Sequence, residues 1–304
     1  ETPFKSGFVS IIGMPNAGKS TLYNALLGEK LAIVNSKAQT TRHRIFGIKN
    51  GEGHQIVFSD TPGILRETSY GMHERMMKFV KESVDDSDVL ILLIDINGKD
   101  FSEEVHEKFD RSKAKKIVVL NKIDKVHQQK LEEKMVWLKK TFEADVYLAI
   151  SAQEKFQIDV LERYLVGFLP EHPAYFPEDQ LTDKTERFFV NEIIRNNVLK
   201  LYDEEVPYSV EVVTLLFKEE PKILRLSCEI IVERPSQKPI IIGKQGQSIK
   251  KLGIESRKEL EQLNSPFIKL VRGRGLLNAI VINHKDTEVS WELCLHLKDL
   301  GLLA

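Results

Sequence analysis

The sequence predicts a doubly wound α/β domain followed by a smaller α+β domain. The chain has 304 residues, about twice the length of a typical domain of roughly 150 residues. Its first half alternates short apolar runs with longer helical patterns, which is typical of parallel strands joined by helices. Three prolines between residues 170 and 177 then mark a change of composition. Helices and strands follow it in a different order, which indicates a second domain.

The first half contains five apolar runs that are expected to form buried parallel strands. They are rich in β-branched residues and apolar on both faces, as strands covered by helices on two sides must be. The runs are Phe8–Ile12, Gln55–Ser59, Val89–Ile94, Ile117–Leu120 and Val146–Ile150. The helices expected between and after them are Ser20–Leu27, Gly71–Ser83, Glu103–Lys113, Gln129–Phe142 and Ile158–Phe168. We assign this domain to residues 1–170.

A linker is expected at residues 171–183, because this stretch is rich in proline and lacks periodicity. The elements expected after it are a helix at Lys184–Tyr202, strands at Tyr208–Phe217 and Leu224–Glu233, a helix at Gln247–Leu263 and an apolar run near Phe267–Val271. We assign residues 184–275 to this second domain. The tail at residues 276–304 keeps apolar side chains, so it is expected to pack on the second domain.

The composition is that of an ordinary globular protein. Charged residues make up 29% and hydrophobic residues 42%, which excludes a disordered or low-complexity chain. The net charge of −1 argues against a nucleic-acid partner, provided that the charge is evenly spread. Cys228 and Cys294 have no metal-ligand spacing and indicate a reducing compartment. The longest apolar run, Val89–Ile94, is far shorter than the roughly 20 residues that span a bilayer.

Residues 13–20, Gly-Met-Pro-Asn-Ala-Gly-Lys-Ser, follow an apolar strand and open a helix, which is the setting of a phosphate-binding loop. Gly13 and Gly18 let the backbone curl so that N–H groups face phosphate oxygens. Lys19 is expected to reach the β- and γ-phosphates, and Ser20 to offer its hydroxyl to Mg²⁺. The phosphate-binding residues expected are Gly13, Asn16, Ala17, Gly18, Lys19, Ser20 and Thr21.

Residues 121–124, Asn-Lys-Ile-Asp, directly follow a predicted strand and are expected to select guanine. The Asp124 carboxylate can accept hydrogen bonds from guanine N1–H and N2–H, whereas adenine would leave it unpaired. Asn121 can contact the base and brace the phosphate loop, and the stem of Lys122 can cover the base plane. The guanine-binding residues expected are Asn121, Lys122, Asp124, Ser151 and Ala152, the last two through their backbone.

Residues 60–63, Asp-Thr-Pro-Gly, end another predicted strand. Asp60 is placed to hold Mg²⁺ through water, and the Gly63 N–H to sense the γ-phosphate. A plain proline–glycine turn is the alternative reading of this tetrapeptide by itself. Its position between the phosphate loop and the guanine-selecting residues favours the nucleotide role.

In this order, the motifs resemble the translation-factor-related branch of P-loop GTPases. The resemblance implies that residues 38–44 form switch I, in which a threonine completes the Mg²⁺ shell and senses the γ-phosphate. Thr41 is assigned that role, and Thr40 is the alternative because the register is ambiguous. The Mg²⁺ ligands expected are therefore Ser20, Thr41 and Asp60. A loop that GTP orders and hydrolysis releases would act as a switch.

No catalytic residue is assigned for hydrolysis. Ile64 stands where small signalling GTPases carry a water-orienting glutamine, and isoleucine cannot hydrogen-bond a water. The intrinsic rate is therefore expected to be low, unless another group acts; Arg42 and Arg44 are nearby in the sequence. Related GTPases with Pro-Asn in the phosphate loop associate an asparagine such as Asn16 with K⁺, so this resemblance implies K⁺ beside the phosphates.

The second predicted domain contains a G-x-x-G loop at residues 243–246, which matches the loop of KH domains that clamps a nucleic-acid backbone. The predicted order α-β-β-α-α-β is that of a type II KH domain. Between residues 234 and 274 ten side chains are basic and three acidic, a local excess of +7. The RNA-binding residues expected are Ile242, Gly243, Lys244, Gln245, Gly246, Lys250 and Lys251, with residues 240–242 as an apolar floor for unstacked bases.

A GTPase domain followed by a proline-rich linker and one type II KH domain resembles the Era family of ribosome-assembly GTPases. The segments Gln39–Arg44, Phe176–Asp179, Glu186–Phe188 and Glu205–Val210 carry this resemblance, which covers roughly residues 5–266. It implies slow GTP hydrolysis with Mg²⁺, binding to the 3′ end of small-subunit ribosomal RNA, and a role in 30S subunit assembly and rRNA maturation. The tail from residue 270 departs from the family pattern.

The alternative is an RNA-binding assembly factor in which the nucleotide is a structural or timing ligand with little turnover. A tRNA-modification GTPase or a double-G-domain GTPase is disfavoured, because the sequence has neither a second G domain nor a C-terminal cysteine motif. We expect a cytoplasmic monomer with no DNA partner, unless a targeting segment was removed before Glu1. Peripheral association with the inner membrane is compatible with the sequence but cannot be read from it.

Overall fold

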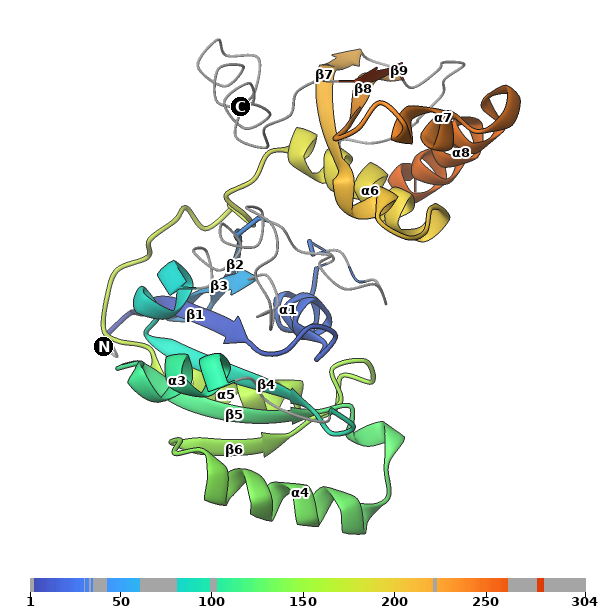
Figure 1. The fold of residues 1–304 in the computed structure, drawn as a ribbon. Coiled ribbons are helices and arrows are strands. Elements are labelled where there is room, and N and C mark those ends of the chain that lie inside the picture. The colour runs from blue at the N-terminus through green and yellow to red at the C-terminus, as the bar shows by residue number, and fades with distance from the viewer. Residues whose placement is uncertain are drawn as a thin grey trace. The chain divides into compact units, whose positions relative to one another are not determined.

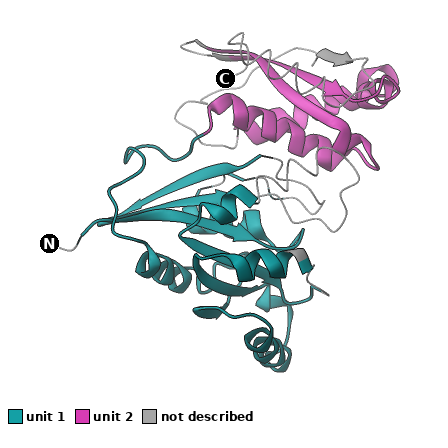
Figure 2. Ribbon diagram, turned by 60° about the vertical axis from the view of Figure 1, so that its left-hand side comes forward, with its two compact units in different colours: residues 1–183 teal, residues 184–304 magenta. Residues whose placement is uncertain are grey.

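The computed structural model describes most of the chain in two compact units, residues 1–183 and 184–304 (Figure 1, Figure 2). The residues described are 3–29, 31–32, 34, 43–60, 81–98, 103–220, 223–261 and 278–281. Each unit has its own hydrophobic core. Within the described residues, no helix has the length and apolarity needed to cross a membrane.

The first unit contains a six-stranded sheet with the strand order β2-β3-β1-β4-β5-β6. The strands are β1 (Lys5–Ile12), β2 (Ile45–Gly51), β3 (His54–Asp60), β4 (Val89–Asp95), β5 (Lys115–Asn121) and β6 (Val146–Ala149). All neighbouring pairs are parallel except β2 and β3, which form an antiparallel pair. The sequence prediction omits β2, because two glycines interrupt this half-buried strand and give it no continuous apolar run.

Helices cover both faces of this sheet, as the doubly wound prediction requires. They are α1 (Lys19–Leu27), α3 (Glu103–Arg111), α4 (Gln128–Thr141) and α5 (Ile158–Phe168), with a short 3-10 helix η1 (Ile123–Lys125). On β4, Ile91 and Leu93 join the core under α1 and α5, whereas Leu90 and Leu92 join the core under α3 and α4. Because successive side chains of a strand point to opposite faces, one strand that is buried from Val89 to Ile94 serves two cores. The helix expected at Gly71–Ser83 lies mostly outside the described residues.

The second unit follows the α-β-β-α-α-β order. Its elements are α6 (Glu186–Leu201), η2 (Val206–Ser209), β7 (Val210–Glu220), β8 (Ile223–Val232), α7 (Gln237–Ile242), η3 (Lys244–Gly246), α8 (Gln247–Glu261) and β9 (Asn278–Val281). The sheet order is β7-β8-β9, with β7 antiparallel and β9 parallel to β8. Val198 of α6, Ile230 of β8 and Leu252 of α8 are fully buried in one core. The two predicted fold classes are confirmed.

The last strand lies further along the chain than the sequence indicates. The apolar run near Phe267–Val271 is outside the described residues, whereas β9 falls within the tail expected at 276–304 and forms the third strand of the sheet. Residues 237–242, which precede the G-x-x-G loop, form helix α7. Tyr202 ties this helix to the end of α6, because its hydroxyl donates to the Ile241 carbonyl at 2.8 Å.

Candidate nucleotide site and nucleic-acid interface

The loop between β1 and α1 needs glycine at two positions for steric reasons. A Cβ on Gly13 would lie 2.4 Å from the carbonyl oxygen of Leu93, so the loop passes directly over β4. Gly18 has φ +98°, in the left-handed region, and a Cβ there would lie 2.5 Å from the side-chain nitrogen of Asn121. The tight curl brings the start of α1 to the carboxyl edge of the sheet, and the N-terminus of a helix favours anions. Thr21 lies in the first turn of this helix and is partly exposed.

Lys19 is a buried cation at this loop. Its ammonium donates to the carbonyl oxygens of Gly13 at 3.1 Å and Met14 at 2.9 Å. Burial lowers the pKa of the Lys19 ammonium from its usual 10.5 to about 8, although the nearby Asp60 carboxylate opposes this shift. Phosphate oxygens at the same place would stabilise the charged form, which is the form that the phosphate loop requires.

Ser20 and Asp60 meet at the same edge. Asp60 is the last residue of β3 and is fully buried, and the Ser20 hydroxyl donates to its carboxylate oxygen Oδ2 at 3.2 Å. A hydroxyl and a carboxylate are the hard oxygen ligands that Mg²⁺ prefers, so this pair fits the ion predicted from the sequence. Thr40, Thr41, Gly63 and Ile64 lie outside the described residues.

Asn121 connects the phosphate loop to the loop after β6. Its side-chain Nδ2 donates to the Ala17 carbonyl at 2.9 Å, and its Oδ1 accepts from the Ala152 N–H at 3.0 Å. All three residues are almost fully buried. The bracing that the sequence predicts for Asn121 is therefore present, and the same amide also holds the Ser151-Ala152 segment in place.

The Asp124 carboxylate is held by a hydroxyl rather than left free to rotate. Asp124 lies in η1 and is exposed, and the Ser151 hydroxyl donates to its Oδ1 at 2.6 Å. Ser151 thus contributes a side-chain contact, whereas the sequence predicts a backbone role for it. An oriented, exposed carboxylate at the carboxyl edge of a parallel sheet is suited to a base that offers two donors.

Lys122 links the base-recognition residues to the phosphate loop. Its ammonium donates to the Asn16 carbonyl at 2.6 Å and to Asp95 Oδ2 at 2.7 Å. Asp95 ends β4 and also accepts from the Asn97 N–H at 2.9 Å. Asp95 was not among the residues predicted from the sequence, although an acidic residue at the carboxyl end of a buried strand is a signal that points to this edge.

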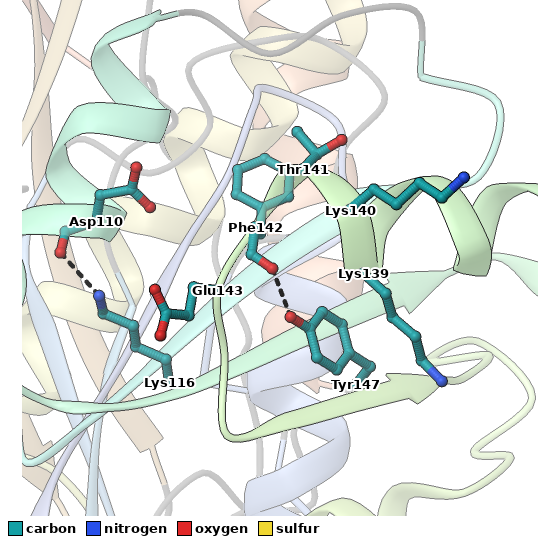
Figure 3. Close-up of a pocket in the computed structure, with 8 residues that line it drawn as sticks. All are labelled: Asp110, Lys116, Lys139, Lys140, Thr141, Phe142, Glu143 and Tyr147. Atoms are coloured by element: carbon teal, nitrogen blue, oxygen red, sulfur yellow. Dashed lines mark hydrogen bonds between the residues drawn. The ribbon is translucent and has the colours of Figure 1, made fainter.

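A separate cavity of about 480 Å³ lies away from these residues. Figure 3 shows the side chains that line it: Asp110, Lys116, Lys139, Lys140, Thr141, Phe142, Glu143 and Tyr147. Lys116 stands near the amino end of β5, and its ammonium donates to the Asp110 carbonyl at 2.8 Å. Because the nucleotide motifs gather at the carboxyl end of the same strand, this cavity is not part of their site.

The G-x-x-G loop of the second unit joins α7 to α8, and three of its four residues have positive φ values. Gly243 has φ +71°, and a Cβ on it would lie 2.1 Å from the Ser248 hydroxyl oxygen. Gln245 and Gly246 also have positive φ values, of 51° and 74°. Unlike Gly243, Gly246 has open space around the position of a Cβ.

The side chains around this loop are basic and accessible. Lys244, Gln245, Lys250 and Lys251 are exposed, and Ile242 is half-buried. Ile240 is 50% exposed, but Ile241 is fully buried in the core. The expectation that residues 240–242 together form an apolar floor is therefore wrong at Ile241, because α7 turns that side chain inward. Seven of the ten basic residues counted between 234 and 274 lie in the described part of the chain.

Two family profiles match the chain. One is described as a 50S ribosome-binding GTPase and matches residues 8–122, and the other is described as a KH domain and matches residues 205–273. The GTPase Era of Geobacter sp. (strain M21) is 45% identical over 266 residues, which are 86% of this chain and 89% of that protein. The GTPase Era of Clostridium acetobutylicum is 41% identical over 261 residues, 85% of this chain and 88% of that protein.

Two solved structures resemble this one over both units. A variant of Aquifex aeolicus Era bound to GDP·AlF₄⁻ has a TM-score of 0.80 and 37% identity, covering 91% of this chain and 93% of that one. Era in complex with MgGDPNP and nucleotides 1506–1542 of 16S ribosomal RNA has a TM-score of 0.83 and 35% identity, covering 99% and 100%. The likeness therefore includes the nucleotide motifs and the G-x-x-G unit together.

Proposed function

This chain belongs to the Era family of GTPases, and on that premise we propose that it is a GTPase that acts in 30S subunit assembly and rRNA maturation. It binds and slowly hydrolyses GTP in the first unit, and it binds the 3′ end of small-subunit ribosomal RNA with the second. The family resemblance read from the motifs is confirmed. The observation that supports GTP binding most directly is the pair of hydrogen bonds made by the Asn121 side chain, which join the phosphate loop and the base-recognition loops into one site.

In this site the residues divide into four sets, and Ser20 and Thr41 each belong to two of them, because Thr41 also senses the γ-phosphate. The loop from Gly13 to Thr21 cradles the phosphates, and Lys19 places a cation beside them. Ser20, Asp60 and Thr41 hold Mg²⁺, which neutralises phosphate charge when it is bound. Gly63 senses the γ-phosphate. Asn121, Lys122, Asp124, Ser151 and Ala152 form the guanine pocket.

Slow GTP turnover follows from Ile64, because an isoleucine side chain cannot orient the attacking water. A K⁺ ion at Asn16 is proposed to assist hydrolysis instead. Asn16 has φ 63° and is exposed, and the Lys122 ammonium holds its carbonyl. That contact fixes the backbone of a residue whose side chain stands at the edge of the phosphate loop. Hydrolysis should be faster in KCl than in NaCl, and equal rates in the two salts would remove this cation from the proposal.

RNA binding is assigned to residues 242–246 with Lys250 and Lys251. An RNA phosphate backbone can approach the loop closely only where the residues are small, as Gly243 and Gly246 are. The lysines supply positive charge that attracts the phosphates. We place the G domain at 1–170, the linker at 171–183 and the KH domain from residue 184 onward. Strand β9 (Asn278–Val281) extends that domain past the expected boundary at 275, into the tail expected at 276–304. Single-stranded RNA is favoured because a duplex hides the base edges. The proposal includes a cytoplasmic monomer that binds the 30S subunit.

The test measures GTP hydrolysis and RNA binding in the same preparation. Multiple-turnover hydrolysis is measured with and without an RNA that ends in the small-subunit 3′ sequence, and the Asp124→Asn variant is measured with GTP and XTP. We expect turnover by the native chain, and a preference for XTP by the variant because an amide donates where the carboxylate accepts. Hydrolysis at background rate in both RNA conditions would instead support the assembly factor with a structural or timing nucleotide, which Ile64 favours.

A further inference from the structure

Three buried serines meet in the interior of the first unit. Ser10 on β1 and Ser59 on β3 are partners in the parallel register, and these two strands lie side by side (Figure 1). Ser83 joins them from the helical residues 81–85, and its hydroxyl oxygen lies 3.1 Å from that of Ser59. The Ser10 hydroxyl donates to the Ser83 carbonyl at 2.7 Å. None of the three residues is exposed, so these contacts satisfy hydroxyls that water does not reach.

The serines lie on the face of the sheet that is turned away from the phosphate loop. Phe58 of β3 joins the core under α1, and Asp60 lies on the same face of the strand, where the Ser20 hydroxyl reaches it. Because successive side chains of a strand alternate, Ser59 projects from the opposite face. Val84 of the helical residues belongs to the core on that opposite face. The serine cluster is therefore separate from the phosphate and Mg²⁺ positions.

Arg44 binds to this cluster from the start of β2. Its Nε donates to the Ser59 hydroxyl at 3.1 Å, and its Nη1 donates to Asp86 Oδ2 at 3.2 Å. The guanidinium carbon lies 4.5 Å from the centre of the Phe46 ring, and Phe46 is the register partner of Ser59. The Arg44 side chain is 16% exposed and that of Asp86 is 62% exposed, so the contact with Ser59 lies deeper than the ion pair.

These contacts bear on what Arg44 can do in hydrolysis. An arginine close in sequence to Thr41 is a natural candidate for a finger that stabilises charge on the transferring phosphate. The guanidinium, however, is bonded to Ser59, on the face of β3 opposite to Asp60. It therefore acts through other residues rather than on the phosphate itself.

The cluster also joins the two segments that are expected to sense the γ-phosphate. Arg44 is the last residue of the segment 38–44 assigned to switch I. Ser59 comes directly before the Asp-Thr-Pro-Gly motif at 60–63, and Ser83 comes after it. Ser59 contacts both Arg44 and Ser83. We propose that Arg44 is a positioning residue for GTP hydrolysis, which ties the end of switch I to the residues on both sides of the second segment.

A shared anchor of this kind affects GTP and GDP differently. Thr41 and Gly63 are the residues proposed to meet the γ-phosphate, which GDP lacks. Fixed ends restrict the conformations of both segments before GTP binds, so less conformational entropy is lost when the γ-phosphate holds them. Arg44 thus contributes to GTP affinity and to kcat, but not to GDP affinity. This inference rests on the proposed function, since it needs GTP binding in the first unit.

The test uses the full chain with Arg44→Met, Ser83→Ala and the double variant, and with Asp86→Asn as the matched control. The control removes the exposed charge beside Arg44 and leaves the contact with Ser59 in place. Affinities for MgGDP, MgGDPNP and MgGDP·AlF₄⁻ are measured by titration, kcat and KM by multiple-turnover hydrolysis, and Tm by thermal unfolding. Ser83→Ala removes a single oxygen atom, so it serves the test even where Arg44→Met does not fold.

We expect Arg44→Met to lower GDPNP affinity and kcat by about 10-fold, the effect of losing one hydrogen bond to a charged group, and to leave GDP affinity native. Ser83→Ala should lower both by about threefold to fivefold, as for a neutral hydrogen bond. Because both changes break one connection, the double variant should lose less than the product of the two factors. The control should behave as the native chain.

Several outcomes would overturn the positioning role. Equal losses of GDP and GDPNP affinity in Arg44→Met indicate a structural role only, and native GDPNP affinity with lost GDP·AlF₄⁻ binding indicates a finger. Unchanged GDPNP affinity and kcat, or losses that multiply fully in the double variant, also contradict the shared anchor. A native chain that does not hydrolyse GTP would instead contradict the proposed function, and the GDP and GDPNP affinities would still decide the role of Arg44.

Discussion

Truncation of Asn121 to alanine should weaken nucleotide binding and the first unit together. The change removes a donor from the Ala17 carbonyl and an acceptor from the Ala152 N–H, both in nearly buried residues. A buried polar group left without its partner costs about 1–3 kcal/mol, so the two give about 2–6 kcal/mol. Because Ala17 and Ala152 lie in loops of the nucleotide site, the free-energy cost divides between the stability of the first unit and the binding of GDP. In the variant, part of the GDP binding energy is used to order loops that Asn121 holds in place in the native chain.

The lower end of this free-energy range gives the smallest effect that Asn121→Ala should have on GDP affinity or on Tm. About 2 kcal/mol is a roughly 30-fold loss of GDP affinity if it falls on binding alone. If it falls on folding alone, it lowers Tm by about 4–8 °C for a unit of this size. Fluorescent GDP titration and thermal unfolding measure the two parts. Asn197→Ala is the control, because Asn197 is equally buried and also makes two hydrogen bonds, but in the second unit. GDP affinity within about threefold of native, with Tm unchanged, would refute the bracing role.

Three further changes test other parts of the site. Burial lowers the pKa of Lys19 to about 8, and phosphate favours its charged form, so GDP affinity should fall as the pH rises from 7 to 9. Calorimetry should detect proton uptake when GDP binds. The Lys19→Met variant should lose this pH dependence. Asp95→Asn should speed GDP release, because it removes the negative charge that orients the Lys122 ammonium. A stopped-flow chase measures the release rate, with Asn97→Ala as the control. Gly243→Ala should weaken RNA binding more than Gly246→Ala, because only the first creates a clash, while GTP hydrolysis stays native in both.

The sequence predicted the nucleotide site well because phosphate and guanine demand particular residues at particular spacings. The glycines of the phosphate loop, Lys19 and Asn121 are all read from local motifs, and the structure brings them to one edge of the sheet. Asp95 escaped the prediction because its partner, Lys122, lies 27 residues away and no motif includes both. Strand β2 escaped it because an edge strand with two glycines lacks the apolar run that marks its neighbours.

The segment 171–183 shows where such prediction reaches its limit, because its contacts with strands β2 and β3 use the backbone. Gln55 binds residues 120 and 121 positions away, and Phe46 binds Asp183 across 137 positions, mostly through N–H and C=O groups that every residue carries. A proline-rich stretch without periodicity therefore reads as a free linker. Yet Pro173 and Pro177 flank Tyr175 and Phe176, whose N–H groups donate to Gln55 Oε1, so neither proline removes a donor from these hydrogen bonds. Proline also restricts the unbound chain, which lowers the conformational entropy lost when residues 171–183 pack on the sheet. The composition that suggested a flexible connection thus favours a fastened one.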